Sequence, residues 1–275
     1  ATTRTSRTML RTIYGKTLWD RRVSTIWWTV GFAALTIMTV AFWPLIDSQR
    51  DAYEVLLEGY PDEMAGFLGL NDIAELFSPV GYINSQIYGN TLPILLFIFA
   101  IGMGTAAVAG EEDRRTMDLL LAQPVLRRDV VLQKFAAMVT LVFLLVAVVF
   151  VLLVISNPLV DLGLSFAGML AVNVAAALLG LLFGAMALAL GALTGRRGLA
   201  IGLSAAIAVA AFFVYGLAPL VDVLEPVGKL SPFYWYLEPN PLANGFSPML
   251  LWMVLFIAVF VAVAVWGFNR RDVSV

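Results

Sequence analysis

The chain has 275 residues, of which 61% are apolar and only 13% are charged, with a mean hydropathy of +0.89. Soluble domains average about 45–50% apolar and about 25% charged residues, so this composition excludes a disordered chain, a collagen-like repeat and a disulfide-linked scaffold. The lack of cysteine and histidine excludes the usual zinc sites, thiolate or Ser-His nucleophiles and haem ligands. A net charge of −2 gives no support for nucleic-acid binding. The composition is that of a membrane protein with several spans.

Six apolar segments are long enough to cross a bilayer, whose hydrocarbon core of about 30 Å needs roughly 20 helical residues. They are residues 25–46, 88–109, 131–155, 166–194, 199–221 and 248–268. The alternating segments of about ten residues that are typical of outer-membrane barrels do not occur. We therefore predict an all-α polytopic membrane protein with one six-helix domain over residues 1–275 and long outer loops over 47–87 and 222–247.

The basic residues indicate how this domain is oriented. Of the 17 Lys and Arg residues, all but Arg50 and Lys229 fall in the N-terminal segment, the regions that follow spans 2 and 4, and the C-terminal tail. Cytoplasmic loops carry an excess of Lys and Arg in membrane proteins. We therefore expect both termini to be cytoplasmic.

The predicted spans contain no Asp, Glu or Arg. Lys134 lies close enough to the cytoplasmic end of span 3, where the span begins, to reach the membrane surface. Ion-coupled carriers usually keep ionisable groups at mid-depth, and intramembrane proteases need paired Asp, Ser-His or metal-binding motifs. The spans are therefore interpreted either as a passive anchor or as a transport path powered elsewhere. A weakly polar path suits an apolar or amphipathic cargo better than an ion.

Small residues recur at four-residue spacing in three spans, which allows helix backbones to approach closely. The stripes are Gly102, Ala106 and Gly110; Ala176, Gly180 and Gly184, then Ala187, Gly191 and Gly195; and Gly198, Gly202, Ala206 and Ala210. We interpret them as packing within the subunit. Asn173, in span 4, is expected to make an interhelical hydrogen bond.

The connection after span 2 reads GEEDRRTMDLLLAQPVLRRD, with acidic residues first and basic residues last. On a helix that starts near Glu111, this order complements the helix dipole. Met117 and Leu120 add an apolar edge, and Pro124 ends the element. We expect a short amphipathic helix that docks a soluble partner, although a solvated linker would also explain the charges.

The run G-E-E-x-x-x-T-x-x-L-L-L-A-x-P-x-x-R in this connection is similar to the segment after span 2 of ABC type-2 permeases. These are the six-span membrane subunits of prokaryotic ATP-binding-cassette exporters. The stretches SPVGYI before span 2, SPFYWY and PLANG in the last outer loop and FNRRD near the end also resemble that family.

The resemblance implies an exporter subunit in the cell membrane of a prokaryote, moving a lipid, drug or peptide. It implies no enzyme activity and no cofactor in this chain, since ATP and Mg²⁺ belong to a partner ABC ATPase subunit. A second copy or a homologous permease would complete the path within the lipid bilayer. The alternatives are a non-transporting anchor or regulatory subunit of an ABC-like complex, and a carrier that works without an ATPase.

The resemblance also assigns roles to two segments. Residues 111–128 would contain the coupling helix that contacts the ATPase, and residues 4–22 would form an amphipathic elbow helix on the inner membrane surface. The candidate coupling residues are Glu111, Glu112, Asp113, Arg114, Arg115, Thr116, Leu120, Pro124 and Arg127, and the basic residues of the elbow are Arg4, Arg7, Arg11 and Lys16. Short re-entrant helices are expected in the last outer loop.

One nucleotide-binding motif is imitated but not formed. Gly15, Lys16 and Thr17 resemble the end of a P-loop, but Leu10 stands where the first glycine of that motif is required. The nucleotide site is therefore expected on another polypeptide.

Overall fold

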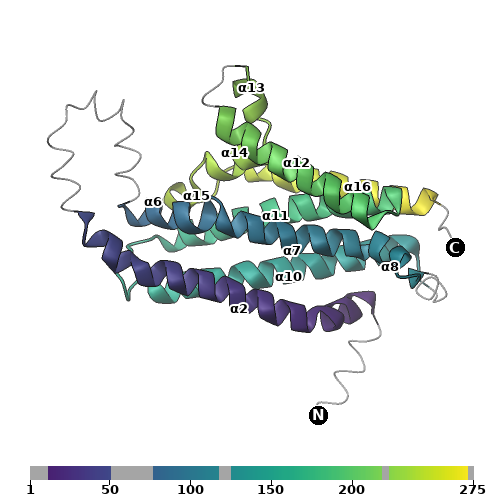
Figure 1. Cartoon of the computed structure of the whole chain (residues 1–275), viewed down its shortest axis with the longest axis horizontal. Helices are drawn as coiled ribbons and strands as arrows, with labels where there is room; N and C mark the ends of the chain where they lie inside the picture. Colours follow the sequence, from purple (N-terminus) through teal and green to yellow (C-terminus); the bar gives the residue numbers. More distant parts are fainter. Residues whose placement is uncertain (1–11, 51–76, 118–124, 219–222, 272–275) are drawn as a thin grey trace, which may run out of the picture.

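The computed structural model describes residues 12–50, 77–117, 125–218 and 223–271. Within them, six helical segments are long and apolar enough to cross a membrane, and they run roughly side by side along the long axis of the molecule (Figure 1). These segments are Ile13–Asp47, Pro79–Ala107, Arg127–Ser156, Phe166–Thr194, Arg197–Leu217 and Leu250–Arg270. The all-helical fold and its six membrane-crossing helices are as predicted.

The first helix, α2 (Ile13–Asp47), is longer than its predicted span. Thr12 caps its N-terminus by accepting a hydrogen bond from the backbone N–H of Gly15 (3.1 Å), and no proline interrupts it before Pro44. Its 35 residues extend about 52 Å at 1.5 Å per residue, which exceeds a hydrocarbon core of about 30 Å.

This helix changes the interpretation of the predicted elbow. Residues 13–22 continue directly into the first span and form no separate helix, because no proline interrupts the helix there. Lys16 is exposed in the first turns of α2, whereas Arg4, Arg7 and Arg11 lie outside the described residues.

The second span begins earlier than the sequence predicts. It consists of α6 (Pro79–Ile83), a π-helical turn η1 (Asn84–Tyr88) and α7 (Thr91–Ala107). Ser78 accepts a hydrogen bond from the N–H of Gly81 (3.0 Å), and Pro79 occupies the first turn, where its missing N–H costs nothing. The SPVGYI stretch, predicted for the outer loop, is therefore the start of the helix.

Helix α11 (Phe166–Thr194) lies at the centre of the bundle and agrees with its predicted bounds. It packs against α7, α10 (Arg127–Ser156), α12 (Arg197–Leu217) and α16 (Leu250–Arg270). A side chain at Gly180 or Gly184 would meet Leu96 and Ala100 of α7, so the small residues of α11 pack within the subunit, as predicted.

The stripes on the neighbouring helices are used differently. On α7 the closest approach is at Gly104, which the predicted stripe does not include, and a side chain at Gly102 would meet no atom within 4 Å. Gly198 and Gly202 of α12 are similarly open. The predicted packing role is therefore wrong for Gly102 and for these two glycines of α12.

The connection between α12 and α16, which the sequence predicts as an outer loop, contains α13 (Glu225–Gly228), α14 (Pro232–Leu237) and α15 (Pro241–Asn244), each with a proline in its first turn. The Tyr236 hydroxyl donates to the carbonyl of Tyr88 (2.9 Å), and the amide of Asn84 donates to Asn240 (2.8 Å). These bonds attach the short helices to the start of the second span. Short helices in this connection were expected, and their re-entrant position in a membrane stays a prediction.

Candidate functional site

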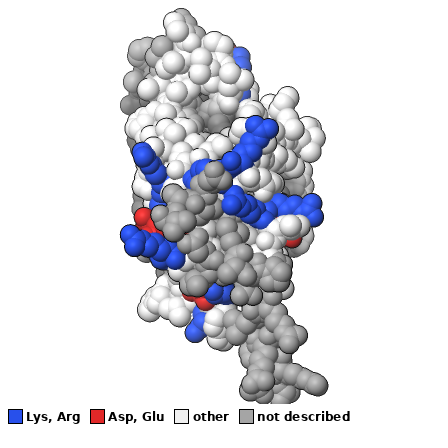
Figure 2. Space-filling model, turned by 90° about the vertical axis from the view of Figure 1, so that its right-hand side faces the viewer, with Lys and Arg blue, Asp and Glu red and all other residues white. Residues whose placement is uncertain are grey.

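Helices α2 and α12 begin, and α16 ends, at one end of the bundle (Figure 1). Most of the described basic residues lie at this end. Figure 2 views this end and shows the Lys and Arg side chains distributed around it. Among the described residues, only Arg50 and Lys229 are basic positions outside this end. We refer to it as the basic end. Helix α8 (Ala109–Asp113), which follows α7, also lies here and carries the acidic residues that the sequence singled out.

Glu111 on α8 is held by two residues of the same chain. Its carboxylate accepts a hydrogen bond from the Lys134 ammonium of α10 (2.6 Å) and another from the Thr116 hydroxyl. Lys134 is only 6% exposed and Glu111 21%. Burial by itself would raise the pKa of Glu111, but the bonds from Lys134 and Thr116 outweigh it and lower that pKa below its ordinary value. Glu111 therefore stays ionised and ties α8 to α10.

Glu112 forms a second connection, to the end of the last helix. Its carboxylate pairs with the Arg271 guanidinium, and the Glu112 side chain is 8% exposed. Arg127 supports the same corner by donating to the carbonyls of Phe268 (3.1 Å) and Arg271 (2.7 Å). Gly195 ends α11 in the left-handed conformation (φ +66°) beside this pair, where a Cβ would overlap both Glu112 and Arg271. The acidic pair thus joins α8 to α10 and α16.

The charged run that follows does not form one helix with Glu111. Helix α8 ends at Asp113, and Arg114 and Arg115 form a turn in which Arg115 has a φ of +56°. The prediction of a single helix starting near Glu111 is therefore wrong for this part, because a left-handed residue cannot continue a helix. Asp113, Arg114 and Arg115 are exposed, so a partner can reach this turn of the predicted coupling segment.

The other predicted coupling residues differ in their accessibility. Thr116 is partly buried against Glu111. Met117, expected on an apolar edge, is 1% exposed and packs with Val130 and Phe268. Leu120 and Pro124 lie outside the described residues. The partners of Glu111 and Glu112 were not predicted, because Lys134 and Arg271 are far away in sequence and no local pattern connects them.

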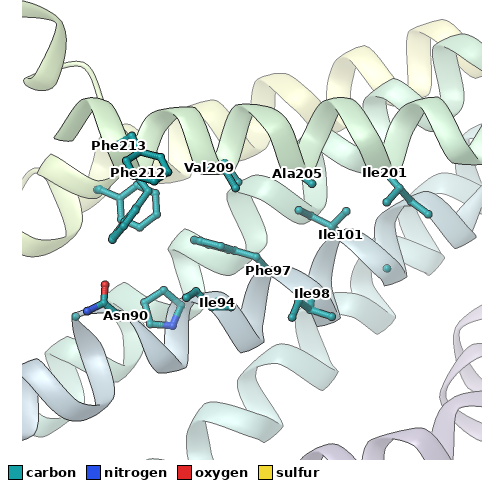
Figure 3. Close-up of a pocket in the computed structure, with 15 residues that line it drawn as sticks. Asn90, Ile94, Phe97, Ile98, Ile101, Ile201, Ala205, Val209, Phe212 and Phe213 are labelled. Carbon is teal, nitrogen blue, oxygen red and sulfur yellow. The ribbon is translucent and has the colours of Figure 1, made fainter. Parts of the chain in front are cut away.

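An apolar groove lies between α7 and α12 (Figure 3). It has a volume of about 530 Å³, and Asn90 is the only polar side chain among the described residues that line it. Its walls include Ile94, Phe97, Ile98 and Ile101 of α7 and Ile201, Ala205, Val209, Phe212 and Phe213 of α12. The sequence does not identify this groove, because groove-lining, core and lipid-facing residues are equally apolar in a membrane protein.

Comparison with known proteins adds an independent observation. The family model described as ABC-2 family transporter protein matches residues 11–273, which is nearly the whole chain. A comparison with curated proteins finds no match.

Proposed function

The chain belongs to the ABC-2 family of transporter proteins, and from this premise we propose that it is the permease subunit of an ABC exporter whose ATP and Mg²⁺ are bound by a separate ATPase subunit. Membership makes the chain the membrane component of an ABC transporter, and this class of component is generally not catalytic. In the proposal, the chain lies in the cell membrane of a prokaryote with its basic end in the cytosol. A second copy or a related permease completes the transport path.

The observation that carries the proposal is the connection of α8 to two spanning helices. Glu111 bonds to Lys134 of α10, and Glu112 pairs with Arg271 at the end of α16, while the adjoining turn at Asp113–Arg115 is exposed. A partner that pushes on this turn therefore moves helix ends and not a free linker. Closure of the ATPase subunits on ATP would rock the spanning helices through this contact.

The groove between α7 and α12 supports the proposed class of cargo. Its walls are almost entirely aliphatic and aromatic, with Asn90 as the single polar side chain in the described part of the lining, so it favours the apolar part of a lipid, drug or peptide over an ion. Its volume of about 530 Å³ is within the range of about 300–1,000 Å³ that is usual for small-molecule sites.

The decisive experiment is reconstitution of the full chain with its ATPase subunit. We expect the double variant Asp113→Ala with Arg115→Ala to bind the ATPase roughly 3- to 10-fold more weakly, as for the loss of two partly exposed ion pairs. Arg196→Ala is the matched control, since Arg196 is exposed at the same end but belongs to the turn between α11 and α12.

Two results would contradict the proposal. Unchanged assembly and unchanged coupling of hydrolysis to transport in the double variant would exclude the turn as the docking contact. A wild-type complex whose ATP hydrolysis responds to no amphipathic cargo would favour a non-transporting anchor.

A further inference from the structure

A second cavity lies at the basic end, where α2 faces α7, α8 and the start of α12. It has a volume of about 400 Å³ and is lined on one side by Asp20 and Arg21 of α2. Glu111, Arg114, Lys134 and Arg197 contribute its other charged side chains. We call it the arginine pocket. The predicted coupling role uses two of these residues, and nothing in the proposed function explains why three arginines share one cavity.

The charges of the arginine pocket do not balance. Glu111 and Lys134 neutralise each other at 2.6 Å, which leaves three arginines against Asp20 among the described residues that line the pocket. Within the described part of the chain, no carboxylate lies within ion-pair distance of Arg21 or Arg197. The charges of Arg114 and Arg197 repel that of Arg21, and those of Asp20 and Glu111 attract it. Excess positive charge in a partly enclosed cavity favours an anion.

Arg197 gives a second indication of a missing partner. Its Nε atom is buried and has no hydrogen-bond partner among the described residues. A buried N–H without an acceptor costs roughly 1–3 kcal/mol, and more on a charged group. A guanidinium presents its N–H groups in a planar fork that fits two oxygens of a phosphate. The missing acceptor is therefore one that an oxyanion would supply.

The arginine pocket and the apolar groove are lined by neighbouring turns of the same two helices, α7 and α12. On α12, Arg197 of the pocket lies one helical turn before Ile201 of the groove. On α7, Ala106 of the pocket lies one helical turn after Gly102 of the groove. The charged pocket and the apolar groove thus follow one another along the same pair of helices, as the head group and the hydrocarbon chain do in a lipid.

We propose that this chain binds an anionic phospholipid, with its phosphate among Arg21, Arg114 and Arg197 and one acyl chain in the groove between α7 and α12. Charge complementarity favours this occupant over a neutral amphiphile, and the adjoining apolar groove favours it over a free anion. Basic pockets between spanning helices on the cytoplasmic side commonly hold anionic head groups. The inference makes the occupant of the groove more specific and rests on the proposed function for the role of that groove.

Lipid binding is measured on the purified full chain without an ATPase, so a failure of binding and a failure of coupling are distinguishable. The probes are fluorescent phosphatidylglycerol, fluorescent phosphatidylcholine and inorganic phosphate. We expect the double variant Arg21→Gln with Arg197→Gln to bind phosphatidylglycerol roughly tenfold more weakly, with phosphatidylcholine unaffected. The control Arg196→Gln removes a neighbouring exposed charge that does not line the pocket, and its affinity should change less than about twofold.

A second arm tests the acyl chain without changing any charge. A side chain at Gly102 or at Gly31 of α2 meets no atom within 4 Å, but only Gly102 lines the groove. Gly102→Leu should therefore weaken phosphatidylglycerol binding, and Gly31→Leu should not. This arm remains informative if the double arginine variant fails to fold.

Three outcomes would overturn the inference. The first is equal affinity of wild type and the double arginine variant for phosphatidylglycerol. The second is an equal loss in Arg196→Gln, which would indicate general surface attraction. The third is full displacement of the lipid by inorganic phosphate together with no effect of Gly102→Leu, which would indicate a free-anion site.

Discussion

Lys134 has a different role in the structure from the one that its position in the sequence indicates. In the sequence it is an isolated ammonium near the end of span 3, close enough to the surface to reach water. In the structure it is 6% exposed and points its charge at Glu111, which lies 23 residues earlier in the chain. The basic residue is therefore not a surface anchor but one half of an internal ion pair.

We predict that Glu111→Gln destabilises the protein by about 3 kcal/mol, the low end of the range for breaking a buried ion pair, because it leaves Lys134 buried without a counter-charge. The measurement is the free energy of unfolding in a detergent-denaturant titration. Asp129→Asn is the control, because Asp129 and its partner Arg128 are 42% and 63% exposed and their pair contributes less than about 1 kcal/mol. Equal losses in the two variants would contradict the buried-pair interpretation.

Glu111 also predicts that the free energy of unfolding depends on pH. The pKa of Glu111 is lowered below its ordinary value of 4.5, so the folded state holds the carboxylate more strongly than the unfolded state does. The resulting stability is fully present above pH 4.5 and is lost as the pH falls through the lowered value. We expect the difference in unfolding free energy between wild type and Glu111→Gln to narrow in acid, since protonated Glu111 is neutral like glutamine. A difference that stays constant throughout the acid titration would exclude this residue as its source.

Other residues could be assigned from the sequence alone. Asn173 donates to the Tyr88 hydroxyl (2.7 Å) across two helices, as expected for an amide inside a membrane bundle. The need of a buried amide for a partner is evident in any sequence, so the bond was predictable. Its partner was not, because Tyr88 reaches it only once η1 and α11 are packed together.

At the scale of the helices, α7 and α11 pack closely because glycine removes the side chain where the two backbones meet. A Cβ on Gly104 would overlap the carbonyl oxygen of Gly184 and lie 3.0 Å from the backbone nitrogen of Leu188. Backbone atoms cannot move aside as a flexible side chain can. The contact therefore fixes the separation of the two helices.

We predict that Gly104→Ala costs about 1–3 kcal/mol of unfolding free energy, the usual effect of overpacking. Gly102→Ala, two residues away, should cost nothing and could gain up to about 1 kcal/mol, because its Cβ meets no atom and alanine favours a helix. Both values come from the same denaturant titration. An unchanged free energy of unfolding in Gly104→Ala, or equal losses in the two variants, would show that a side chain fits between the two helices at Gly104.

Helix bounds show which part of the fold the sequence determines. The α11 span was predicted at both ends because its apolar run stops at Ser165 and Gly195, which cap the helix. The start of the second span was missed because Asn84, Ser85 and Gln86 lower the local hydropathy. The amide of Asn84 donates to Asn240, which caps α15, and this tertiary contact has no local signature.

At the scale of the whole molecule, the side of the membrane on which the basic end lies determines whether the proposed ATPase can bind the chain. The sequence predicts the clustering of Lys and Arg, and the structure brings these residues together from helices that are far apart in the chain (Figure 2). The arginine pocket and the apolar groove could not be predicted, because each depends on how α7 and α12 are placed. Only a cytosolic basic end would allow the exposed turn at Asp113–Arg115 to meet a soluble ATPase.

The orientation can be tested on the chain as it stands, because it contains no cysteine and any introduced thiol is unique. Arg128 at the basic end is 63% exposed, and Val223, in the loop between α12 and α13, is 80% exposed. We expect a membrane-impermeant maleimide to label Val223→Cys in intact cells and Arg128→Cys only after lysis, since segments rich in Lys and Arg are retained in the cytosol. The cysteine-free chain is the control for background labelling. The reverse pattern would place α8 outside the cell, where no ATP-driven subunit could reach it, and the coupling proposal would fail with the orientation.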